Sequence, residues 1–165
     1  MTESSRPRAD ALYLEAFPEG ERIPGELLHA ASGRDGMEYR CITEDGSFVG
    51  ICFTAETPDT LYIIYLAIEA GHRSGGYGGK ALRRLMELSG KRTFLNIEPL
   101  DKGSDNYEQR VRRRDFYVRN GFREHGLVEA PDGNVFMVMT ANGDFAESDI
   151  EEVYGRLGLL WAGKE

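Results

Sequence analysis

The chain has 165 residues, the size of one globular domain, with apolar residues at 41% and charged residues at 29%. Its 20 basic and 28 acidic residues give a formal net charge of −8, which argues against nucleic acid or an anionic membrane as partner of the whole surface. The longest apolar run has eight residues, 61–68, whereas a membrane-spanning helix needs about 20. We therefore expect one cytoplasmic domain over residues 1–165, with no membrane and no nucleic-acid partner.

The first half of the sequence predicts two short helices followed by an antiparallel sheet. Residues 1–9 are polar and expected to fray, and apolar side chains at helical spacing predict a helix from Ala9 to Phe17. Pro24 is a good first-turn residue for a second helix. The Asp45-Gly46 pair is a hairpin turn signal, and the three predicted strands are 38–43, 48–55 and 61–68.

The second half changes from hairpins to a strand–loop–helix crossover. A loop with five glycines, 69–79, precedes a helix whose apolar stripe runs through 80–88. Gly121 is well placed to end a helix over 107–120. The other predicted elements are a strand at 92–97, a hairpin of strands from Phe122 and over 135–140 joined by a turn at 131–134, and a helix at 149–157 within a C-terminal helix and tail, 141–165. These elements predict an α+β fold with a mixed, mostly antiparallel sheet and one parallel crossover at its centre.

Charge is distributed unevenly along the chain. The segment from Arg73 to Arg123 holds 13 of the 20 basic residues but 6 acidic ones, a local charge of +7. Most of its arginines, such as Arg83, Arg84 and the run 112–114, are expected on the solvated faces of helices. The segment as a whole nevertheless indicates an anionic ligand.

The glycine loop indicates which anion this segment binds. Glycines let the backbone approach a ligand closely and turn successive N–H groups the same way. A helix begins directly after the loop, and its free N–H groups and dipole favour an anion. Arg73 and Lys80 add formal positive charge at this junction. Phosphate is therefore the predicted ligand of the loop.

Two common phosphate-binding motifs fit the loop poorly. A P-loop needs G-x-x-x-x-G-K-[ST], and the sequence S-G-G-Y-G-G-K-A fails it at Ser74 and at Ala81. The dinucleotide fingerprint G-x-G-x-x-[GA] is formally matched from Gly76. That fingerprint should follow its strand at once, whereas Gly76 lies eight residues beyond Ile68.

A third motif, [RQ]-x-x-G-x-[GA], is matched by Arg73, Gly76 and Gly78. With the apolar strand before it, the sequence resembles the GNAT superfamily of N-acetyltransferases, in particular its small single-domain bacterial members. The segment D-F-Y-V-R-N-G-F, 115–122, resembles the F-Y-x-x-x-G-F segment of that family. The two hairpins also fall in family order, so the resemblance covers most of 37–140. The first strand usual in the family has little room in the first ten residues.

This resemblance implies a GNAT-like sheet with helices on both faces and acetyl transfer from acetyl-CoA to an amine. The cofactor would lie between the strands 61–68 and 92–97, with its pyrophosphate on the glycine loop. The family asparagine that often contacts the cofactor is replaced by Arg110, and Asn106, one turn earlier, is the remaining candidate. The predicted cofactor-binding residues are Leu66, Ala67, Ile68, Arg73, Ser74, Gly75, Gly76, Tyr77, Gly78, Gly79, Lys80 and Asn106.

Acetyl transfer also needs groups that move protons. Tyr117 matches the family tyrosine that often protonates the leaving thiolate, and a phenol can donate a proton at neutral pH. An ammonium has no lone pair, so a base must remove its proton. Glu98, at the end of the second strand of the pair, is the predicted base, with Glu69 as a weaker alternative.

The acceptor and the competing interpretation rest on fewer residues. We expect a cationic small-molecule or peptide amine, because the region of the first two helices is acidic, with Glu15, Glu19, Glu21 and Glu26. The alternative is a non-catalytic acyl-CoA-binding module, which would have no use for the proton donor Tyr117. The three histidines lack metal-ligand spacing, so no metal is expected, and a homodimer is left open.

Overall fold

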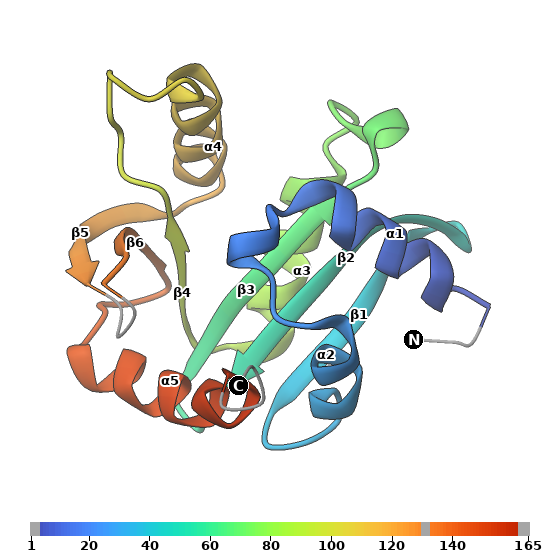
Figure 1. Ribbon diagram of the computed structural model, residues 1–165, viewed down its shortest axis with the longest axis horizontal. Helices are drawn as coiled ribbons and strands as arrows, with labels where there is room; N and C mark the ends of the chain where they lie inside the picture. The colour runs from blue at the N-terminus through green and yellow to red at the C-terminus, as the bar shows by residue number, and fades with distance from the viewer. Residues whose placement is uncertain (1–3, 130–132, 162–165) are drawn as a thin grey trace.

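The structure is a computed structural model that describes residues 4–129 and 133–161 (Figure 1). The helices and strands follow the predicted order, and each predicted strand is found within one or two residues of its expected bounds. Its elements are α1 (Arg6–Ala16), a 3-10 turn η1 (Glu19–Glu21), α2 (Gly25–Ala31), β1 (Met37–Glu44), β2 (Ser47–Glu56), β3 (Thr60–Ile68), a second 3-10 turn η2 (Ala70–His72), α3 (Tyr77–Ser89), β4 (Arg92–Ile97), α4 (Tyr107–Arg119), β5 (Arg123–Glu129), β6 (Val135–Ala141) and α5 (Glu147–Trp161). Part of the predicted turn at 131–134 lies outside the described residues.

The strands form one sheet in the order β1-β2-β3-β4-β6-β5. Among the pairings of the described residues, β3–β4 is parallel and the other four are antiparallel. α3 makes the connection between the two parallel strands, as such a crossover requires. The predicted α+β architecture with one central crossover is therefore confirmed.

Helices cover both faces of the sheet, and each face has its own core. One core combines the sheet with α1, α2 and α5, through residues such as Leu12, Leu28 and Val153. The other packs Leu82 of α3 and Phe116 of α4 against the opposite face. In Figure 1, α1 and α2 lie in front of β1–β3 while α3 lies behind them.

The N-terminus differs from the expectation. Residues 6–9 belong to α1, and Ala9 is fully buried. Its carbonyl also accepts a hydrogen bond from the Tyr39 hydroxyl at 3.2 Å. The polar composition concealed an apolar stripe of Ala9, Leu12 and Tyr13, whose burial on the sheet stabilises even a short helix. No strand precedes α1 in the described part of the chain.

The C-terminal helix begins earlier than expected, because Asp149 stabilises its first turn. The Asp149 carboxylate accepts the Ala146 N–H at 2.9 Å, the reach-back bond of a capping box. It also accepts two bonds from the Arg92 guanidinium, at 2.7 and 2.9 Å. Ala141 is the last residue of β6, so the C-terminal segment starts after it.

A β-bulge in β3 lies where this strand separates from β4. Phe53 pairs with Tyr65 and Thr54 with Ile63, so Ile64 is an extra residue in β3. The parallel pairing with β4 ends just before it, at Tyr62 and Phe94, although both strands continue. A bulge bends its strand and increases the twist, which accounts for the divergence of the two strands.

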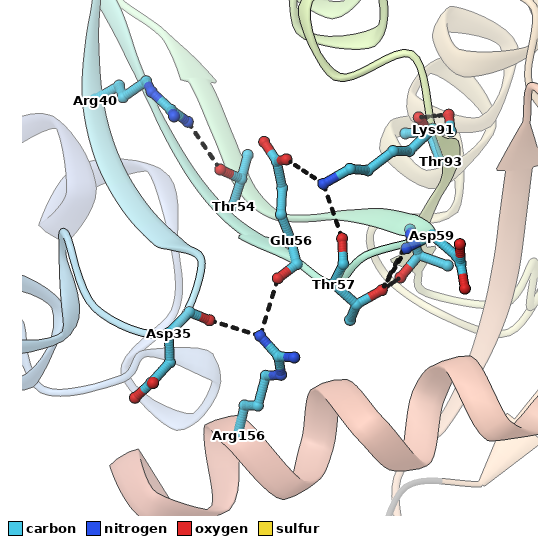
Figure 2. A network of polar contacts seen from close by, with 10 residues as sticks. Asp35, Arg40, Thr54, Glu56, Thr57, Asp59, Lys91, Thr93 and Arg156 are labelled. Carbon is cyan, nitrogen blue, oxygen red and sulfur yellow. Dashed lines mark hydrogen bonds and ion pairs between the residues drawn. The ribbon is translucent and has the colours of Figure 1, made fainter.

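The closed end of this divergence is held by a polar network (Figure 2). Arg156 of α5 donates to the carbonyls of Asp35 and Glu56, at 2.8 and 3.0 Å. Lys91, just before β4, donates to the Glu56 carboxylate and to the Thr57 carbonyl, both at 2.8 Å. The strands are thus tied together where they pair and free where they separate.

The bulge also turns Tyr65 toward the face of α1. Ile64 and Tyr65 both contact the core under that helix, whereas regular alternation would send Tyr65 to the α3 face. The Tyr65 hydroxyl donates to the Glu21 carbonyl at 2.7 Å and accepts the Ile23 N–H at 3.1 Å. Tyr13 donates to the Ile23 carbonyl at 2.9 Å. Two buried tyrosines therefore fix the connection between α1 and α2.

Removing the Tyr13 hydroxyl should measurably destabilise the protein. Tyr13→Phe leaves the buried Ile23 carbonyl without its donor, which lowers the free energy of unfolding by about 1–3 kcal/mol. Urea denaturation should show a lower midpoint at an unchanged slope. Tyr107→Phe is the control, because the Tyr107 hydroxyl makes no hydrogen bond within the described residues. Equal midpoints for the two variants would contradict this account of the connection.

Candidate active site

A cavity of about 650 Å³ opens where β3, the glycine loop, α3 and α4 meet. It brings together nine of the predicted site residues: Leu66, Ile68, Arg73, Ser74, Gly76, Tyr77, Gly78, Gly79 and Tyr117. These come from the end of β3, from the loop after it and from a helix about forty residues later. The predicted cofactor loop and the predicted proton donor thus share one cavity.

The remaining predicted residues lie beside this cavity or away from it. The side chain of Ala67 packs in the core on the other face of the sheet, because the bulge shifted the alternation of β3. Gly75 and Lys80 belong to the loop and to α3 but do not line the cavity. Asn106 and Glu98 belong to a separate ionic cluster between β4 and α4.

The glycine loop presents free backbone N–H groups to the cavity. Gly76 is the N-cap of α3, with φ +77°, and no side chain caps the helix. The first intrahelical bond is Lys80 N–H to the Gly76 carbonyl at 3.0 Å, so the amides of residues 77–79 precede it. Ser74 also has a positive φ of 67°. A loop of this kind at a helix N-terminus has N–H groups and a dipole that favour an anion.

Two glycines allow α3 to approach α4 closely. A Cβ atom on Gly78 would lie 3.0 Å from Cζ of Phe116, and one on Gly79 would lie 2.6 Å from Oδ1 of Asn120. Asn120 is itself held, because its Nδ2 donates to the Phe116 carbonyl at 2.8 Å. The glycines of the loop therefore serve helix packing as well as ligand access.

Three arginines that line the cavity were not predicted as site residues. Arg83, Arg113 and Arg119 line the cavity together with Arg73. The sequence analysis expected Arg83 and Arg113 on solvated helix faces. The local charge of +7 between Arg73 and Arg123 indicated that basic residues of this segment bind a ligand. Which of its arginines line the cavity depends on how α3 and α4 face each other.

The two predicted loop cations are paired with acids. Lys80 Nζ lies 2.8 Å from Glu44 Oε1, and this pair raises the pKa of Lys80. Arg73 Nε donates to the Ile68 carbonyl at 3.2 Å, and its Nη2 lies 4.0 Å from a Glu15 oxygen. All four charged side chains of these pairs are exposed, so an incoming anion can replace the acids at small free-energy cost.

Tyr117 packs in the cavity wall with a protonated hydroxyl. Its ring lies 5.2 Å from that of Phe116 and 5.6 Å from that of Phe122. Burial raises the pKa of Tyr117 to about 12, against the opposing effect of the nearby Arg113 charge. The phenol is therefore neutral at physiological pH and able to donate.

Glu98 has its carboxylate oxygens occupied. Arg113 Nη1 donates to Oε2 at 2.8 Å, and Oε1 lies 3.3 Å from both Arg110 Nη2 and Asn106 Nδ2. Arg110 also donates through Nε to Asn106 Oδ1 at 2.8 Å. This cluster attaches the first turns of α4 to the end of β4, and it reduces the availability of Glu98 as a base.

Glu69, the weaker alternative base, points toward α1. Its two oxygens accept from Arg8 at 2.6 and 2.7 Å, and this pair holds the pKa of Glu69 below its usual range. Within the described ranges, no three His, Cys, Asp or Glu side chains are grouped to hold a metal ion. No helix there is long and apolar enough to cross a membrane.

Comparison with solved structures identifies the fold. A GNAT-family acetyltransferase from Bacteroides thetaiotaomicron, described as putative, is 24% identical, with a TM-score of 0.75 over 95% of this chain and 93% of that chain. An aminoglycoside 6'-N-acetyltransferase complexed with coenzyme A is 14% identical, with a TM-score of 0.63 over 84% and 91%. The ribosomal-protein-S18-alanine N-acetyltransferase from Escherichia coli is 15% identical, with a TM-score of 0.61 over 89% and 94%.

Sequence comparison agrees with the structural likeness. No curated protein sequence matches the chain. The sequence model of the acetyltransferase (GNAT) family matches residues 6–122, which extend from α1 through the glycine loop to the end of the F-Y-x-x-x-G-F segment. The chain therefore belongs to the GNAT family of acetyltransferases.

Proposed function

We propose that this acetyltransferase takes the acetyl group from acetyl-CoA and transfers it to an amine of a cationic small molecule or peptide. The single observation that supports this most is the cavity in which the free N–H groups of α3 and the hydroxyl-bearing Tyr117 meet beside the diverging strands. Acetyl transfer from the thioester of a phosphorylated carrier requires an anion site for the phosphates and a proton donor for the leaving thiolate, both at the same gap.

The phosphate end of the carrier fits the glycine loop. The amides of residues 77–79 would donate to the pyrophosphate, and Arg73 and Lys80 would add charge by exchanging their carboxylate partners for phosphate. Arg83 and Arg119 lie on the same cavity wall and supply further cations for a multiply charged ligand.

The pantetheine arm fits the gap between β3 and β4. Beyond Tyr62 and Phe94 the two strands no longer pair, so the end of β3, which still pairs with β2, has no strand partner on its β4 side. A carrier with amide groups can take the place of the missing strand neighbour. The acetyl carbonyl would then accept a backbone N–H, which favours the developing oxyanion.

A glutamate introduced at Gly76 should abolish binding of coenzyme A. The carboxylate would occupy the phosphate position of the loop and repel the ligand. Gly90→Glu, at the other end of α3, is the matched control, because both glycines have positive φ and open space around an added Cβ. Isothermal calorimetry should show binding lost in the first variant and kept in the second. Undiminished affinity of Gly76→Glu would refute the assignment of the loop.

Tyr117→Phe should slow thiol release with little change in coenzyme A affinity. Loss of a general acid lowers turnover about 10²–10⁴-fold. Thiol release is followed with a panel of spermidine, kanamycin and a peptide with a free N-terminus. Because the acid must be protonated and its pKa is raised to about 12, wild-type turnover should not fall between about pH 7 and 10.

Two results would change the interpretation of Tyr117. Turnover equal to that of the Tyr107→Phe control would reassign Tyr117 to packing. Coenzyme A binding without thiol release from the wild type, for every amine of the panel, would favour the alternative of a non-catalytic acyl-CoA-binding module.

The proposed acceptor side of the β3–β4 gap lies opposite the cavity, on the face of the sheet that α1 and α2 cover, where the surface is acidic and polar. Glu19 and Glu21 lie on η1, and Glu26 lies in the first turn of α2. Asn96, in the part of β4 that no longer pairs with β3, donates through Nδ2 to the hydroxyls of Tyr62 and Tyr154 at 3.2 and 3.1 Å. Its buried Oδ1 has no partner within the described residues and could accept an acceptor N–H.

The second-order rate constant for a cationic acceptor should fall as salt is added. Acidic residues around the acceptor side would attract the cation, and salt screens this attraction once the Debye length drops below about 10 Å, near 0.1 M. Measuring kcat/KM for spermidine from low to high salt tests the proposal. A constant value, or a preference for acceptors with carboxylates, would contradict it.

A further inference from the structure

We propose that Glu21, on the connection between α1 and α2, removes the proton from the acceptor ammonium. This inference rests on the proposed acetyl transfer and deepens it, because it assigns the base to a residue outside the family motifs. Four observations support this assignment. The backbone of Glu21 is fixed, charged residues act on its carboxylate, this carboxylate has no partner among the described residues, and the carboxylate of Glu98 is already bound by other side chains.

The backbone at Glu21 is fixed rather than free. Tyr65 bonds to the carbonyl of Glu21 and to the N–H of Ile23, which holds both sides of the residue between them. In Figure 1 the segment between α1 and α2 crosses in front of β3 toward the gap beside β4. Tyr65 belongs to the diverging part of β3. Glu21 is therefore held at the acceptor side of that gap.

The charges that act on Glu21 come from the far side of the gap. Its carboxyl interacts with Glu98, after β4, and with Arg110 and Arg113 of α4. Partial burial is the largest cause that raises the pKa of Glu21, the Glu98 charge raises it further, and the two arginines oppose this. A raised pKa brings the carboxylate closer to the proton affinity that a base near neutral pH requires.

Glu21 is available where Glu98 is not. Its carboxylate has no hydrogen bond or ion pair to another described residue, whereas both oxygens of Glu98 are held by Asn106, Arg110 and Arg113. Glu98 thus neutralises two arginines and positions α4, and its negative charge increases the basicity of Glu21. The two glutamates have separate tasks on the two sides of one gap.

The step balances with residues of this chain alone. A carboxylate oxygen of Glu21 takes a proton from the ammonium nitrogen, whose freed electron pair forms the new C–N bond with the acetyl carbon. The C–S bond breaks, and the hydroxyl of Tyr117 gives its proton to the departing sulfur. Glu21 then returns its proton to water, and the second proton that the nitrogen loses as the amide forms passes through water to the Tyr117 phenolate.

The experiment compares Glu21→Gln with Glu87→Gln, the same change at an exposed glutamate of α3 that does not line the cavity. We expect the Glu21 variant to lose about 10²–10⁴-fold in kcat for the best amine of the panel and to keep its coenzyme A affinity. Its rate should rise steadily with pH, because only free amine can then react. Glu21→Asp should recover part of the activity, and Glu87→Gln should behave like the wild type.

Wild-type rate and pH profile in Glu21→Gln, with turnover lost in Tyr117→Phe, would overturn the inference while leaving acetyl transfer intact. If the wild type releases no thiol with any amine, the proposed function fails instead. A measurement without substrate then still tests the placement of Glu21. Carboxyl NMR should show that Glu98→Gln lowers the pKa of Glu21, because a repelling charge disappears and two arginines are freed. An unchanged pKa would refute the placement.

Discussion

The architecture of this acetyltransferase depends on two parallel strands that stop pairing halfway. β3 and β4 share three residue pairs and then separate, although β3 continues for six residues and β4 for three. Backbone groups that lose their sheet partners need others. One inserted residue, Ile64, is sufficient to bend β3 away and to shift its alternation.

That shift has consequences on both faces of the sheet. Leu66 faces the cavity beside α3 and α4, while Tyr65 faces α1 and holds the connection that carries Glu21. The gap and its proposed cofactor and acceptor sides thus share a common origin. At the end where β3 and β4 pair, Arg156 and Lys91 hold the strands together, so the separation remains confined to the opposite end.

Electrostatics prepares the same region for an anion. The cations of the loop lie in exposed ion pairs with Glu15 and Glu44, which solvent screens, so an anion can replace these acids. Arg113 differs, because it is shared between the cavity and the Glu98 cluster. It therefore links the cofactor side of the gap to the acceptor side through a single guanidinium.

Local patterns in the sequence were sufficient to predict the helices, the strands and the glycine loop. Apolar periodicity, the Asp45-Gly46 turn and the glycines after Ile68 predicted the helices and strands along the chain, the parallel crossover and the position of the loop. Features that depend on long-range packing were not predictable. The bulge at Ile64 leaves no periodic signal, and the pairing of Glu98 with α4 depends on how a loop folds back. Glu21 lies 77 residues before Glu98, and the charges of the two glutamates interact only in the folded chain.

The most direct test of this account is a crystal structure of the protein with coenzyme A. The account predicts pyrophosphate oxygens about 2.7–3.2 Å from the N–H groups of residues 77–79, the pantetheine arm between β3 and β4, and the sulfur beside the Tyr117 hydroxyl. Coenzyme A bound elsewhere on the molecule, or β3 and β4 paired along their full length, would contradict it.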